Sequence, residues 1–264
     1  MAIVNDILTF METLAPTHMK MSWDNVGLLC GSRKAEVKKI LVALDPFEGV
    51  CREAESWGAD VIVTHHPIIF QPLKNVTDDT SIGRSIQLLC RTGISAINAH
   101  TNLDCVPGGV NDRLAHKLGL ADVKVVNPMG ETPDGEPWGL LRKGTVEEQP
   151  LEKFLAVVKQ NLGCEGLRYV DGGKPVRNVA VGGGACAGEM LEAFEAGCDT
   201  FVTSDVKYNQ FWDARDMGLN LIDAGHFYTE NPVTEYLAEK LREAFPEAEV
   251  KISETHCDCM KFFG

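Results

Sequence analysis

Apolar residues along the chain alternate between short continuous runs, which indicate buried strands, and a spacing of three to four residues, which indicates helices packed on one face. In the first half, the predicted strands are residues 39–44, 61–64 and 94–98, and the predicted helices are residues 49–57, 82–92 and 110–118. Alternation of this kind is typical of a parallel sheet with helices packed against it.

The same alternation resumes after residues 125–150, where the stretch NPMGETPDGEPWG is dense in proline and glycine and predicts a loop or domain boundary. The predicted strands of this half are residues 176–181, 200–203 and 219–222, and the predicted helices are residues 151–162, 189–196, 210–217 and 232–245. We therefore predict an α/β protein of two similar α/β domains with largely parallel sheets. Residues 1–124 plus 227–264 would form the first domain, and residues 125–226 an inserted second domain.

An internal repeat supports the prediction of two similar domains. Residues 42–66 align without a gap on residues 181–205, and the aligned pairs include Val42 with Val181 and Asp60 with Asp199. The stretches GISAINAH and GLNLIDAGH, which follow later in each half, are also alike. A duplicated α/β unit would place polar residues at equivalent strand ends.

Histidines and carboxylates do follow three of the predicted strands. His65 and His66 follow the strand at residues 61–64, and His100 and Asp104 follow the strand at residues 94–98. His226 and Glu230 follow the strand at residues 219–222. Ligands bind beyond the carboxyl ends of parallel strands, and this mixture of nitrogen and oxygen donors suits zinc, iron or manganese. Each residue alone could be an ordinary turn or cap residue, so the prediction of a metal site depends on their convergence. Because Asn231 precedes a proline, we expect His226 and Glu230 to span a turn.

A glycine-rich stretch offers a competing interpretation as a nucleotide fold. Gly182, Gly184 and Ala187 follow a predicted strand in the pattern G-x-G-x-x-A, and Asp205 ends the next strand, where a dinucleotide fold binds ribose. The fingerprint is short and no Lys-Ser or Lys-Thr pair follows it, which excludes a P-loop. A second possibility is that the backbone amides of Gly182 to Gly184 hold an anionic group of a substrate.

Charge and cysteine content narrow the possible partners. The 264 residues carry a formal net charge of −13, which repels phosphate backbones and anionic lipids, so we expect neither nucleic acid nor membrane as a partner. The first residues lack the basic start of a secretory signal, and we expect a cytoplasmic protein.

Nine scattered cysteines indicate reduced, mostly buried thiols. The close pair Cys257 and Cys259, with His256, could alternatively bind a soft metal.

Four stretches together resemble a known family. SWDNVGLLCG, VIVTHHPIIF, NAHTNLDCVPGGVNDRLAHKLGL and LIDAGHFYTE are similar to the dinuclear-metal proteins called GTP cyclohydrolase 1 type 2 homologues, or NIF-three-like proteins. The resemblance implies a two-domain α/β protein assembled as a toroidal homohexamer, with two divalent metal ions per subunit. It implies that the metal ligands are His65, His66, Asp104, His226 and Glu230. His100 matches a histidine beside the metals, with a supporting or catalytic role.

The resemblance leaves two functions open. One is a metal-dependent hydrolase that uses an activated water on a small anionic or nucleotide-like substrate, with His100 as the general acid. The other is a non-catalytic hexamer, in which the metals serve structure or regulation. One departure bears on this choice, because Asn209 lies near a place where relatives often have a histidine.

Overall fold

The computed structural model describes residues 1–263, which form two compact units. Unit 1 comprises Met1–Leu103 and Val233–Cys257, and unit 2 comprises Asp104–Pro232 and the residues from Asp258 onward. The chain leaves unit 1 within helix α4 (Thr101–Cys105) and returns to it near the start of helix α10 (Pro232–Ala244).

Unit 1 is built on a five-stranded sheet with the order β15-β4-β5-β6-β2. The bounds are β15 (Glu249–Ile252), β4 (Lys39–Ala43), β5 (Val61–Thr64), β6 (Ser95–Asn98) and β2 (Gly27–Cys30). The first four of these strands are parallel, and β2 closes the edge in the antiparallel direction. A separate antiparallel pair is formed by β1 (Ala2–Ile3) and β3 (Glu36–Val37).

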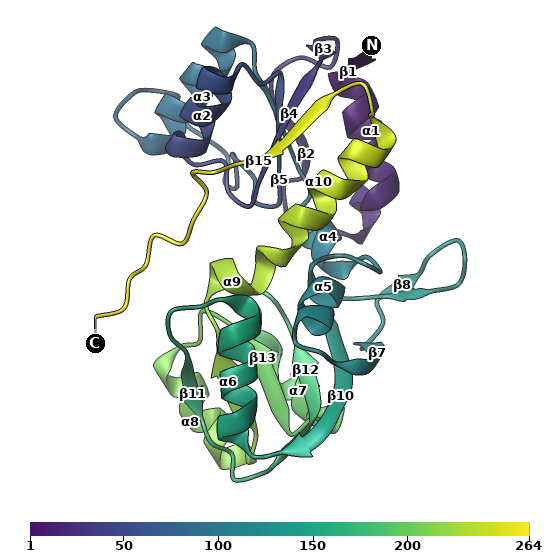
Figure 1. Ribbon diagram of the computed structural model, residues 1–264, viewed down its shortest axis with the longest axis vertical. Helices are drawn as coiled ribbons and strands as arrows, with labels where there is room; N and C mark the ends of the chain where they lie inside the picture. The colour runs from purple at the N-terminus through teal and green to yellow at the C-terminus, as the bar shows by residue number, and fades with distance from the viewer. Residues whose placement is uncertain (264) are drawn as a thin grey trace. The chain divides into compact units, whose positions relative to one another are not determined.

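Helices cover both faces of the unit 1 sheet (Figure 1). Helices α2 (Glu48–Trp57) and α3 (Ser81–Thr92) lie together on one face, where Leu41, Ile62 and Ala96 join the same hydrophobic cluster as the helices. Because side chains alternate along a strand, the intervening residues, such as Ile40 and Val63, point to the opposite face. Helices α1 (Val4–Leu14) and α10 lie on that face, and the short helix η1 (Thr17–Met19) follows α1.

Unit 2 is built on a six-stranded sheet with the order β11-β14-β13-β12-β10-β7. The bounds are β11 (Arg168–Val170), β14 (Asn220–Asp223), β13 (Thr200–Thr203), β12 (Val176–Val181), β10 (Leu141–Gln149) and β7 (Ala121–Val126). The central strands β12, β13 and β14 are parallel, and the other three pair in the antiparallel direction. A small hairpin consists of β8 (Gly130–Glu131) and β9 (Pro137–Trp138).

The two faces of the unit 2 sheet are covered by different helices. Val181, Val202 and Ile222 pack with residues of α5 (Val110–Lys117) and α6 (Leu151–Leu162). The neighbouring residues Ala180, Phe201 and Leu221 pack on the other face with residues of α7 (Met190–Glu195) and α8 (Tyr208–Met217). Helices η2 (Cys186–Glu189) and α9 (His226–Glu230) complete the unit. Because alternate side chains of these strands are buried on opposite faces of the sheet, the strands read as continuous apolar runs.

The predicted α/β class, with helices packed on sheets, is confirmed. Each unit has three adjacent parallel strands joined in chain order, which is compatible with a duplicated unit. The units do not begin and end at the predicted domain limits, since unit 2 already begins at Asp104. The reason is that Leu114 and Leu118 at α5 are part of the hydrophobic cluster of unit 2.

The stretch 125–150 is more ordered than its glycine and proline content suggests, because β10 is the nine-residue strand Leu141–Gln149. All nine cysteines are free thiols, and five of them are buried, as the scattered spacing predicted. Within residues 1–263, no helix combines the length and the apolar composition that crossing a bilayer requires.

Candidate metal centre

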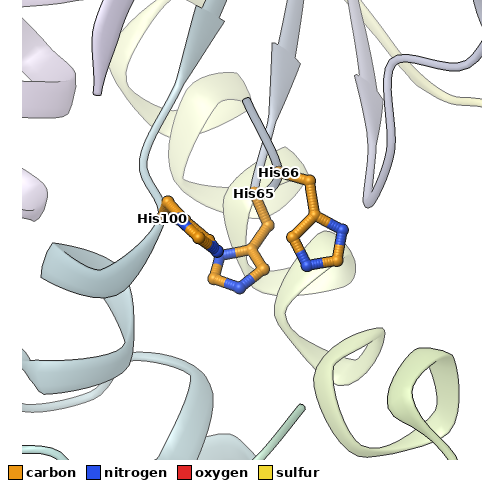
Figure 2. A group of neighbouring side chains, drawn as sticks. All are labelled: His65, His66 and His100. Carbon is orange, nitrogen blue, oxygen red and sulfur yellow. The ribbon is translucent and has the colours of Figure 1, made fainter. Parts of the chain in front are cut away.

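Three histidine rings of unit 1 gather just beyond the ends of two parallel strands (Figure 2). β5 ends at Thr64, so His65 and His66 are released from strand geometry, and their ring centroids lie 4.8 Å apart. His100 follows β6, and its ring centroid lies 5.2 Å from that of His65. Each of the three offers a nitrogen within 4.8 Å of the others, a spacing at which a metal ion can be held.

Hydrogen bonds fix which nitrogen of each ring points into this group. Nδ1 of His65 lies 2.9 Å from the carbonyl oxygen of Ala99, and Nδ1 of His66 lies 2.6 Å from Oδ1 of Asp45. An Nδ1–H that donates to oxygen leaves Nε2 as the nitrogen with the metal-binding lone pair. Metal-binding histidines in proteins are commonly supported in this way.

His100 is held by a buried aspartate. Its Nδ1 lies 2.8 Å from Oδ1 of Asp24, and the other oxygen of Asp24 accepts hydrogen bonds from the amide and hydroxyl of Thr101. Burial alone would raise the pKa of Asp24, but the hydrogen bonds from His100 and Thr101 outweigh it and lower this pKa well below its ordinary value. Asp24 therefore stays ionised and orients the His100 ring.

Unit 2 carries a second group of donors on α9. Nε2 of His226 lies 3.1 Å from Oε2 of Glu230, and its Nδ1 lies 2.9 Å from Oδ2 of Asp205. The prediction that this pair spans a turn is wrong, because His226–Glu230 is a single helical turn and Asn231 keeps helical angles of φ −54° and ψ −27°. The bias of the residue before a proline is overcome here, as α10 begins immediately at Pro232.

Asp104 joins the donors of unit 2. It follows β6 in the chain, lies in α4, and offers an oxygen within 4.8 Å of a carboxylate oxygen of Glu230. Both carboxylates are buried, with Asp104 7 % and Glu230 4 % exposed. Burial, together with the charges of Asp104 and Glu230, raises the pKa of the nearby Cys186 thiol well above its usual value. Two buried carboxylates beside a histidine form a donor set that suits a hard or borderline divalent cation.

The glycine-rich stretch shapes this donor set instead of binding a nucleotide. The amides of Gly182, Gly183 and Gly184 donate to Val202 O, to Asn111 Oδ1 and to Thr229 Oγ1 respectively. With all three amides bonded within unit 2, the expected anion cradle is absent from this stretch. Asp205, the expected ribose ligand, hydrogen-bonds to His226 instead. The structure therefore does not support the dinucleotide interpretation.

Gly184 lies so close to the donors that no side chain fits. A Cβ there would lie 1.9 Å from Oε1 of Glu230 and 3.0 Å from Nε2 of His226, and its φ of +61° also disfavours other residues. Because the backbone of Gly184 lies so close to Glu230, it limits the positions that the carboxylate of Glu230 can take. The glycines singled out for phosphate binding are thus required for close packing.

We expect Gly184→Ala to lower the affinity for divalent metal by roughly 10- to 100-fold, the usual effect of displacing a group that orients a ligand. The measurement is competitive titration of metal-depleted protein with a chromophoric chelator. Gly188→Ala is the matched control, because a Cβ at Gly188 would meet no atom within 4 Å. Equal affinities of the two variants would show that Gly184 does not constrain the donors.

Four supporting residues were not identified from the sequence. Asp24, Asp45 and Asp205 hold histidines, and the fully buried Asn111 links Asp104 O to the amide of Gly183. A signal was available for two of them, since Asp45 lies two residues beyond β4 and Asp205 two beyond β13. In both cases the aspartate after one strand supports the histidine after the next parallel strand.

The alternative site in the tail is not found. Among residues 1–263, the groups of donors close enough to share a metal do not include His256, Cys257 or Cys259. Burial lowers the pKa of His256, while both cysteines are exposed. Soft-metal binding by these three residues has no support in the structure.

Comparison with known proteins places the chain in a family. The family model Duf34/NIF3 (NGG1p interacting factor 3) matches residues 2–258. The chain belongs to the Duf34/NIF3 family. A Clostridium perfringens relative named GTP cyclohydrolase 1 type 2 homolog is 36 % identical over 91 % of each chain. A Helicobacter pylori relative named GTP cyclohydrolase 1 type 2 is 32 % identical, over 91 % of this chain and 92 % of its own.

Solved structures of the family share the fold. A Bacillus cereus protein related to NIF3 aligns with a TM-score of 0.94 at 27 % identity, and the alignment covers 99 % of both chains. A Staphylococcus aureus protein aligns with a TM-score of 0.91 at 30 % identity, also over 99 % of both. The resemblance stated from the histidine motifs is confirmed. The residue that departs from the family pattern, Asn209, is exposed on α8, where Nδ2 lies 3.5 Å from Oδ2 of Asp213.

Proposed function

We propose that this Duf34/NIF3 protein is a metal-dependent hydrolase whose centre takes two divalent ions of zinc, iron or manganese. The proposed ligands are His65, His66, Asp104, His226 and Glu230. His65 and His66 belong to unit 1, and Asp104, His226 and Glu230 belong to unit 2.

The proposal rests mainly on the hydrogen bonds that hold the histidine rings. Each of His65, His66 and His226 has Nδ1 within 2.9 Å of a carbonyl or carboxylate oxygen. Histidines that served only packing would not need a hydrogen bond to the same ring nitrogen, Nδ1, in all three cases. The repeated arrangement leaves Nε2 of each ring, on the side away from the supporting oxygen, as the nitrogen that can bind a metal.

The protein's own groups would then position a substrate and move a proton. Bound divalent ions would supply a water of lowered pKa and polarise an oxygen of the substrate. His100, held by the ionised carboxylate of Asp24, can carry a proton on Nε2 and donate it to the leaving group. The hydrogen bond to Asp24 fixes the orientation of the ring. The names of the relatives make a purine nucleotide, opened at a C–N bond by water, the first substrate to test.

Metal analysis followed by an activity panel tests this function. We expect untagged protein, reloaded with zinc, iron or manganese and desalted, to retain about two ions per chain and to hydrolyse at least one member of the panel. The panel contains nucleotides, phosphoesters and cyclic amides. Protein that binds two ions but turns over no substrate with any of the three metals would support the non-catalytic alternative.

We also propose that the chain assembles as a closed homohexamer. The proposal rests on the family resemblance and on apolar side chains that unit 2 exposes on α7 and α8. Leu191, Tyr208 and Trp212 are 55 %, 80 % and 49 % exposed, and large exposed apolar side chains are available for contacts between subunits. The formal charge of −13 opposes nonspecific association, so specific, symmetric contacts are expected.

Light scattering coupled to size exclusion should therefore report a single species of six chains at micromolar concentration. Trp212→Lys places a charge on the exposed face of α8 and should shift the population toward smaller species. Lys153→Arg, on the exposed face of α6, is the control and should leave it unchanged. A monodisperse monomer for the unaltered protein would contradict the proposal.

A further inference from the structure

A cavity of about 320 Å³ opens beside His66 within unit 1. Its walls come from the loop after β4, the segment after β5 and the first two turns of α3. It therefore lies at the carboxyl ends of parallel strands, where α/β proteins bind ligands. Asp45, which accepts the hydrogen bond from Nδ1 of His66, belongs to the same wall. A molecule in this cavity would lie against the histidine group.

The lining is mostly apolar and carries no positive charge. Its apolar members are Pro46, Phe47, Pro67, Ile68, Phe70 and Ile82. The polar members are Asp45, His66, Ser81 and Ser85, so none of the ten residues is a lysine or an arginine. A phosphate or carboxylate entering here would lose its water and meet the carboxylate of Asp45 without a cation. In protein without bound metal, the lining side chains therefore disfavour an anionic group.

Two exposed aromatic side chains indicate the shape of the preferred ligand. Phe47 is 61 % and Phe70 43 % exposed, although both line the cavity. Leaving such rings in water is unfavourable, and a flat ring packed against them would bury their faces. Ser81 and Ser85 at the first turns of α3 add hydroxyl groups that can pair with ring carbonyl or N–H groups.

Phe70 also connects the cavity to the predicted reaction site. Its ring lies edge-on to that of His100 at a centroid distance of 5.9 Å, and edge-on to Trp23 at 5.8 Å. Trp23 is itself 60 % exposed. An aromatic wall thus runs from the cavity to the proposed general acid. A ring held by this wall would present its edge to His66 and His100.

We propose that the cavity binds an uncharged planar ring, of the nucleobase or cyclic-amide class, and thereby sets the substrate class of the hydrolase. This inference rests on the proposed function for its role in catalysis, but not for binding itself. The volume is at the lower end of the roughly 300–1,000 Å³ typical of ligand pockets, which suits a small ring. Charged portions of a larger substrate would lie outside the cavity.

Ligand-observed NMR on the full chain tests the proposal with hypoxanthine, uracil and inosine triphosphate as probes. We expect at least one of the two uncharged rings to bind protein that has been treated with chelator. Phe47→Ala should weaken that binding by roughly five- to tenfold, the effect of losing one aromatic contact. Ser81→Trp, which fills the cavity from its exposed rim, should abolish it. Tyr169→Ala removes a 50 % exposed aromatic ring of unit 2 and is the control that should have no effect.

The outcomes separate this inference from the proposed function. If neither ring binds at millimolar concentration, or if binding is equal in Phe47→Ala, Ser81→Trp and the unaltered protein, the cavity proposal is overturned even if two metals bind. If the rings bind as expected while the protein holds no metal, the cavity proposal stands and the hydrolase proposal fails. Binding of inosine triphosphate alone, unaffected by either cavity variant, would also overturn the cavity proposal.

Discussion

Replacing Glu230 by glutamine is expected to reduce the bound divalent metal from about two ions per chain to nearly none. The side chain is 4 % exposed, and its carboxylate adjoins both His226 Nε2, at 3.1 Å, and a carboxylate oxygen of Asp104. Glutamine keeps the shape but removes the charge that offsets a dication, and it turns an acceptor into a buried donor. Elemental analysis by plasma mass spectrometry after reloading and desalting measures the change.

Glu235→Gln provides the matched control, because Glu235 is exposed on α10 only five residues further along the chain. It should retain the metal content of the unaltered protein. Circular dichroism of Glu230→Gln should show an unchanged fold, so that loss of metal is not confused with unfolding. Retention of one ion would limit Glu230 to one of the two proposed positions. Retention of both would remove it from the ligand set.

The parallel core could be predicted from sequence because both faces of its strands are buried. Such strands read as short apolar runs, and β4, β5, β12 and β13 fall where these runs predicted them. β10 was missed because its sequence LRKGTVEEQ mixes charged residues with apolar ones, as an antiparallel strand with a partly exposed face can. Its pairing with β7 and β12 depends on contacts distant in the chain, which local patterns do not contain.

The histidines could be found from sequence, whereas the supporting role of the aspartates was missed, even for Asp45 and Asp205, which lie just beyond strand ends. His100 and Asp24 are 76 residues apart, and the pairs His66 with Asp45 and His226 with Asp205 are each 21 residues apart. A hydrogen bond across such separations is created by the register of neighbouring strands. The role of Gly184 also depends on a contact distant in the chain. A G-x-G pattern looks the same in sequence whether the backbone lies close to a phosphate or to a carboxylate of the protein.

Replacing His100 by alanine is expected to leave the metal content near two ions per chain and to lower hydrolysis by roughly 10² to 10⁴, the usual contribution of a general acid or base. The expectation follows from the support of its ring, because Asp24 stays ionised and holds Nδ1 at 2.8 Å. This hydrogen bond fixes the orientation of the ring, as a proton donor requires. The rate is measured on whichever panel substrate the unaltered protein hydrolyses, together with metal content.

Two further variants separate a proton donor from a metal ligand. His116 is exposed on α5, so His116→Ala should change neither metal content nor rate. Asp24→Asn weakens the hydrogen bond that orients the His100 ring and should lower the rate while both ions stay bound. The nitrogen of His100 also lies within 4.8 Å of donor atoms of His65 and His66, so a ligand role predicts a different result. In that case His100→Ala would lose metal together with activity. If His100→Ala keeps both the metals and the full rate, the proton is supplied by another group, and the Asp24–His100 pair serves structure alone.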